Sequence, residues 1–217
     1  MTIKKNALLA AILGLMSAPA LAHNAFAGPY VGASLGFFQG NATSTEYSGD
    51  WDYGEYTMNG DIDLSYGLQA GFNVGIGNSG IAGIELSYSA PQFEEKRTFN
   101  TTYINAAEWK SVISLSAKGG VVVDKTLLYV KAGLSQVDAE YGFGDSALPA
   151  DFTAASEDVM GLSVGAGVEF ALSDQLSVRG EYSSLDLESV DIGDFGGSPG
   201  SFQSSGNSFT VGVNFNF

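Results

Sequence analysis

The sequence predicts an all-β protein: an eight-stranded antiparallel up-and-down transmembrane β-barrel that follows an N-terminal signal peptide. Eight segments alternate strictly between apolar and polar residues, the period-two pattern of strands with one apolar face. The connections between them alternate between short and long. No stretch beyond the N-terminus is long and apolar enough for a membrane-spanning helix, so the chain would have to cross a membrane with strands.

The first 22 residues form the predicted signal peptide. Two lysines precede an apolar core at residues 7–15, and Ala20-Leu21-Ala22 is a small-x-small cleavage site. This core is too short to span a bilayer as a helix, which needs roughly 20 residues. A second possible cut lies after Ala27. The barrel domain is then residues 23–217.

Each predicted strand carries bulky apolar residues on one parity and mainly glycine and serine on the other. The first strand begins with an aromatic residue, and the second keeps the alternation for thirteen residues. The third to seventh strands each place one or two charged residues on the polar parity. The eighth runs to the last residue, with Phe209, Val211, Val213, Phe215 and Phe217 on one face. In chain order, the strands are 30–40, 64–76, 82–90, 113–121, 128–135, 162–170, 176–183 and 208–217.

The lengths of the connections favour an outer-membrane barrel. Three are tight turns, at 77–80, 124–126 and 173–175. Four are long and polar, near 43–62, 94–110, 143–158 and 186–206. Barrels of the bacterial outer membrane have short periplasmic turns and long external loops, and an even number of strands leaves both termini on the periplasmic side.

Composition limits the classes of function. The chain has 217 residues, no cysteine, and a formal net charge of −15 from 9 basic and 24 acidic residues. Absence of cysteine excludes disulfides and thiolate chemistry, and the acidic balance argues against a nucleic-acid partner. Only 15% of the residues are charged, so the chain is not a disordered acidic one.

Side-chain volume decides which face of the strands points inward. A secreted carrier of the lipocalin type would put the apolar parity inside. An eight-stranded barrel, however, has an interior just wide enough for side chains to fill. The small parity therefore fits the inside, and the bulky parity faces lipid.

Six charged residues lie on the inward parity in this orientation. Three are acidic and three are basic, which predicts a mutually neutralised network that fills the lumen, since burying one sign alone would be prohibitive. The alternative is a narrow ion path lined by the same residues. The six are Glu85, Lys118, Lys131, Glu169, Arg179 and Glu181.

We expect no catalytic, metal or cofactor site. The only histidine, His23, lies at or before the mature N-terminus, which excludes a histidine-dependent hydrolase inside the barrel. A carboxylate enzyme built on Glu169 and Glu181 is conceivable, but both are better explained as ion-pair partners. Asp50 and Asp52 resemble part of a calcium loop, without its glycine at the sixth position or its late glutamate.

The first long loop is both acidic and aromatic. Trp51, Tyr53 and Tyr56 could contact a host surface or a sugar, or they could pack together at the membrane interface. The sequence leaves these alternatives open.

Several segments resemble the small outer-membrane β-barrel proteins, the OmpA-like and opacity-type surface antigens of Gram-negative bacteria. These segments are 28–36, 128–133, 164–170 and 178–182, and the chain ends on an aromatic residue as in that family. The resemblance implies that Phe215 and Phe217 are a C-terminal signal for the barrel-insertion machinery. It specifies the barrel well and a molecular activity poorly.

The predicted protein is a non-enzymatic structural and surface-antigen barrel of the Gram-negative outer membrane. One alternative is a narrow porin-like channel for small solutes, and another is an adhesin acting through its acidic, aromatic external loops. The expected partners are outer-membrane lipid and lipopolysaccharide, the insertion machinery, and a host or cell-surface ligand at the loops. We expect a monomer.

Overall fold

The computed structural model describes residues 25–48, 51–91, 93–99, 103–145, 153–195 and 198–217. No helix in this part of the chain is long and apolar enough to cross a membrane. The predicted signal peptide, residues 1–22, lies outside the described residues. The strands are β1 (Gly28–Ser48), β2 (Trp51–Ile76), β3 (Gly80–Pro91), β4 (Phe93–Phe99), β5 (Tyr103–Val123), β6 (Thr126–Asp145), β7 (Thr153–Ala171), β8 (Leu176–Leu187), β9 (Val190–Phe195) and β10 (Ser198–Asn216).

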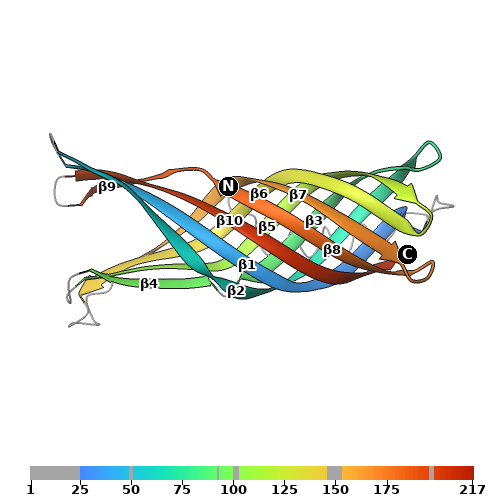
Figure 1. The fold of residues 1–217 in the computed structure, drawn as a ribbon, viewed down its shortest axis with the longest axis horizontal. Coiled ribbons are helices and arrows are strands. Elements are labelled where there is room, and N and C mark those ends of the chain that lie inside the picture. Colours follow the sequence, from blue (N-terminus) through green and yellow to red (C-terminus); the bar gives the residue numbers. More distant parts are fainter. Residues whose placement is uncertain (1–24, 49–50, 92, 100–102, 146–152, 196–197) are drawn as a thin grey trace.

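The strands close into one antiparallel barrel (Figure 1). Pairing runs in the order β1, β2, β3, β5, β6, β7, β8 and β10, and β10 pairs with β1 to complete the circle. β4 continues the line of β3 along β5, and β9 continues that of β8 along β10. The predicted eight-stranded antiparallel barrel is thus confirmed.

The register of the pairs fixes the tilt of the barrel. Following the paired residues once around from Tyr30 in β1 leads back to β1 at Gly40, a displacement of ten residues. With about 3.4 Å per residue and about 4.8 Å between strands, this displacement gives a tilt of about 40° and a backbone radius of about 8 Å. The tilt is visible in Figure 1.

The strands reach further than predicted at one end of the barrel. The tight turns lie where expected, and the two-residue turn after Val123 places Asp124 at a φ of 54°. The stretches predicted as long polar loops, in contrast, are mostly paired strand, as in β1 up to Ser48 and β5 from Tyr103. Antiparallel pairing continues wherever backbone partners persist, even without an apolar face. The alternation of apolar and polar residues therefore predicted strands that are shorter than those in the structure.

The bulky apolar parity points outward, as predicted. Leu68 is 62% exposed and Val211 56%, whereas the inward Glu85 is 1% exposed. Apolar side chains of this kind lie on every one of the eight long strands. A carrier with an apolar interior and a polar exterior is excluded by this arrangement.

Candidate functional site

All six predicted lumen charges point into the barrel. They come from β3, β5, β6, β7 and β8, and the pairing register brings them to similar depths in the lumen. Lys118 pairs directly with Lys131, and Glu169 pairs directly with Arg179. Two lysines opposite one another would repel each other unless an anion lay between them.

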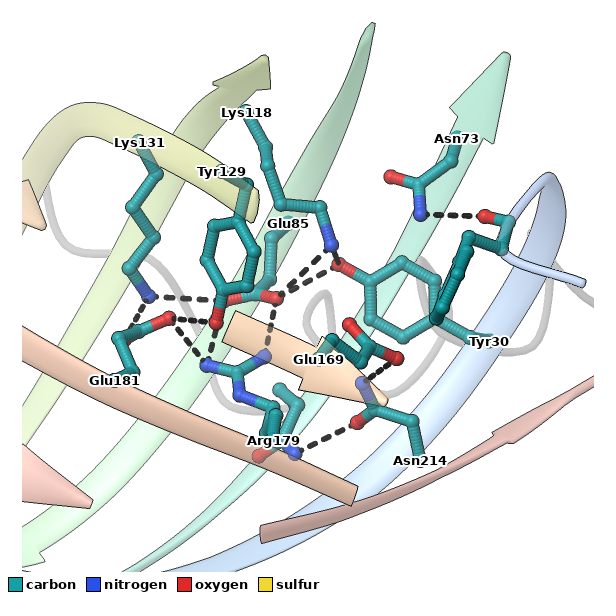
Figure 2. A network of polar contacts seen from close by, with 12 residues as sticks. Tyr30, Asn73, Glu85, Lys118, Tyr129, Lys131, Glu169, Arg179, Glu181 and Asn214 are labelled. Carbon is teal, nitrogen blue, oxygen red and sulfur yellow. Dashed lines mark hydrogen bonds and ion pairs between the residues drawn. The ribbon is translucent and has the colours of Figure 1, made fainter. Parts of the chain in front are cut away.

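Glu85 supplies that anion (Figure 2). Its carboxylate accepts hydrogen bonds from Arg179 Nη1 at 2.7 Å and from Lys131 Nζ at 2.9 Å. Lys118 Nζ lies 3.9 Å away. Three cations from three other strands therefore surround the Glu85 carboxylate, and two of them donate hydrogen bonds to it.

Glu181 completes the same ion-pair cluster from β8. It accepts from Lys131 Nζ at 2.7 Å and from Arg179 Nη2 at 2.7 Å. Lys131 and Arg179 thus each bridge the two carboxylates. With Lys118 included, these five residues carry three positive and two negative charges.

Glu169 has a different set of hydrogen-bond partners. Its carboxylate accepts hydrogen bonds from the Ser177 hydroxyl and from Asn214 Nδ2, the latter at 2.8 Å. Asn214 in turn accepts from Gln69 Nε2 at 2.9 Å. The neighbouring Arg179 turns its guanidinium to Glu85 and Glu181 instead. The charge of Glu169 makes the six residues neutral in total, although its own hydrogen-bond donors are uncharged side chains.

Two tyrosines belong to the network and were missed by the sequence reasoning. The Tyr30 hydroxyl donates to Glu85 at 2.7 Å and accepts from Lys118 Nζ at 2.9 Å. The Tyr129 hydroxyl donates to Glu181 at 2.8 Å. Lys118 Nζ also lies 4.4 Å from the centroid of the Tyr30 ring, a cation–π contact. The available signal was parity, since Tyr129 shares the parity of Lys131 on β6, and Tyr30 shares that of the small residue Ser34 on β1.

Glycines make room for both tyrosine rings. Gly71 pairs directly with Tyr30, and Gly167 pairs directly with Tyr129. A Cβ at either glycine would lie 2.4 Å from the tyrosine hydroxyl and ring. Each ring therefore lies across the neighbouring strand over a bare backbone.

Apolar side chains pack together inside the barrel on both sides of this network. Toward the long-hairpin end, the upper apolar layer surrounds Phe38 and Trp109, whose ring centroids are 5.2 Å apart. Toward the tight turns, the lower apolar layer includes Phe26, Leu127 and Tyr129. The upper layer consists of Phe38, Trp109, Val112, Val137, Ala139, Val159, Leu185 and Leu187, and the lower of Phe26, Ala27, Ile81, Leu127, Tyr129 and Ala171.

A small cavity lies between the network and the upper apolar layer. It measures about 90 Å³ and is lined by serines from most strands, with Lys131, Arg179 and Glu181 at its floor. On this measure one water molecule needs about 10–15 Å³, so the cavity has room for several water molecules.

The other predicted residues fall elsewhere. Phe215 and Phe217 lie on the outer surface next to the tight turns, with ring centroids 5.1 Å apart in an edge-to-face arrangement. Asp50 lies outside the described residues, and nothing is described of the side chains of residues 51–59. The insertion signal and the aromatic loop stay predictions.

A closed antiparallel barrel with an apolar exterior and a filled polar lumen defines the class: a small β-barrel of the outer-membrane type. Residues 8–217 match the family model described as "Outer membrane protein beta-barrel domain". The chain belongs to this family, and it is a protein of the Gram-negative outer membrane.

Known relatives are distant but cover most of the chain. It is 23% identical over 202 residues to the 31 kDa outer-membrane immunogenic protein of Brucella melitensis, covering 88% of this chain and 83% of that protein. Among solved structures, OprG from Pseudomonas aeruginosa is similar with a TM-score of 0.55 and 13% identity, covering 88% and 97% of the two chains. Neisserial surface protein A gives a TM-score of 0.46 and 17% identity, covering 87% and 97%.

Proposed function

We propose that this chain is a non-enzymatic structural and surface-antigen barrel that spans the outer membrane with a closed lumen. The observation that carries the proposal is the filled interior: the ion-pair cluster lies between two apolar layers. An ion moving along the axis would have to separate ion pairs shorter than 3 Å and displace the Phe38 and Trp109 rings.

The outer surface supports the transmembrane placement. Its exposed apolar side chains include Ile76 near the tight turns and Leu64 about twelve residues away along the same strand. At a tilt of about 40°, that distance corresponds to roughly 30 Å along the axis, which matches the hydrocarbon thickness of a bilayer. The role of surface antigen is supported by the Brucella relative, whose name describes it as an immunogenic outer-membrane protein.

Single-channel recording in planar bilayers tests the closed lumen. The folded protein should show no stable, reproducible conductance step. A positive control is a variant in which the upper layer is opened by Phe38→Ala and Trp109→Ala and the cluster by Arg179→Ala; if still folded, it should conduct. Reproducible steps from the unmodified protein would favour the narrow porin-like channel instead.

A further inference from the structure

The lower end of the lumen is closed by a segment that precedes the first strand. Ala25, Phe26 and Ala27 come before β1, yet Phe26 is only 2% exposed. Its side chain packs with Ile81, Leu127 and Ala171, which belong to three different strands. The chain thus enters the mouth of the barrel before it joins the sheet.

A polar contact holds this segment in the mouth. Asn73 Nδ2, on the inward face of β2, donates a hydrogen bond of 2.8 Å to the backbone carbonyl of Phe26. Asn73 is 3% exposed, so this amide has no bulk water as an alternative partner. Gly28 follows with a φ of 114°, a conformation that strongly favours glycine and lets the chain turn from the mouth into β1.

We infer that residues 25–27 are part of the mature protein, in which Phe26 is a stopper of the periplasmic mouth, and that signal-peptide cleavage therefore occurs after Ala22 and not after Ala27. Cleavage after Ala27 would remove the ring from the lower apolar layer and leave the amide of Asn73 without its partner. The barrel above would stay filled by the ion-pair cluster, so this inference is independent of the closed lumen proposed above.

Mass spectrometry of the intact protein purified from outer membranes gives the direct test. A mature chain that begins at His23 supports the inference. A chain that begins at Gly28 overturns it. The two products differ by five residues, which intact-mass measurement resolves without ambiguity.

Cysteine labelling tests the stopper itself, because the native chain has no cysteine. Ala171→Cys puts a thiol in the lower apolar layer that contains Phe26, where Ala171 is 6% exposed. A small charged thiol reagent should react with it at least about tenfold faster in the Phe26→Ala background. The matched control, Ser173→Cys in the exposed turn, should react equally fast in both backgrounds.

Heat-modifiable gel migration identifies the folded fraction, and labelling is counted only there. If Phe26→Ala lowers the folded yield, Phe26→Leu gives a second comparison, with a smaller acceleration expected. Equal reactivity of the thiol introduced by Ala171→Cys in all backgrounds would overturn the inference. That result is also the one expected if processing removed Phe26 together with the signal peptide.

Discussion

Replacing Glu85 with glutamine tests whether the lumen charges are energetically paired. The substitution keeps the shape of the side chain and removes its charge. The Glu85 carboxylate only accepts hydrogen bonds. Lys131 donates to Oε1, and Arg179 and Tyr30 donate to Oε2. Whichever way the new amide turned, its NH₂ group would face donors.

The expected cost follows from these contacts. Two cations lie within 3 Å of the carboxylate, and a hydrogen bond to a charged group contributes about 1.5–3 kcal/mol. Removing one partner of a buried ion pair costs about 3–5 kcal/mol because a charge is left uncompensated. We therefore expect Glu85→Gln to lower the free energy of unfolding by about 3–5 kcal/mol.

Urea unfolding in lipid vesicles, followed by heat-modifiable gel migration, measures this loss. The control is Glu188→Gln, which removes the same charge at an exposed site and should stay within about 0.5 kcal/mol of the unmodified protein. Adding Lys118→Met to Glu85→Gln returns the summed charge of the lumen residues to zero. The double variant should therefore recover about 1 kcal/mol or more of the lost free energy of unfolding. The pairing would be refuted if Glu85→Gln unfolded at the same urea concentration as Glu188→Gln.

Three further predictions concern the tyrosine packing, the lumen charges and the C-terminus. Gly71→Ala should cost about 1–3 kcal/mol in urea unfolding because its Cβ would overlap the Tyr30 ring; Gly75→Ala, with no atom within 4 Å of its Cβ, should be nearly neutral, and equal costs would count against the packing argument. Lys118→Glu adds a carboxylate next to Glu85 and should lower the thermal unfolding temperature, so unchanged stability would contradict the network. Phe217→Ser should reduce the folded protein recovered from outer membranes while protein refolded in detergent keeps its unfolding temperature; normal recovery would refute the insertion signal.

The sequence was sufficient for the number of long strands and for the faces of their predicted parts, because alternation reports directly which side chains share a face. It placed Glu85 and Arg179 inside without revealing that they touch. These residues lie 94 positions apart, and their contact depends on the shear of the barrel and on side chains that reach across several strands. Parity likewise could not separate Glu169, which bonds to Ser177 and Asn214, from the five residues of the ion-pair cluster. The upper apolar layer escaped prediction because Phe38 interrupts an otherwise small parity, and because a β-bulge between Trp109 and Ser111 turns Trp109 inward against the parity of Lys118.

Large inward side chains on some strands lie over small ones on their neighbours, and together they fill the interior. The sequence predicted the small inward residues but not the large aromatic ones. A displacement of ten residues for eight strands makes a barrel whose interior glycine and serine alone would leave hollow. Tyr30 and Tyr129 fill it by lying over Gly71 and Gly167, their direct partners in the neighbouring strands. The hydroxyls of the two rings then donate hydrogen bonds to the carboxylates of Glu85 and Glu181. A glycine opposite an aromatic residue on the inward parity of two adjacent strands is therefore the feature through which this sequence places large rings inside the barrel.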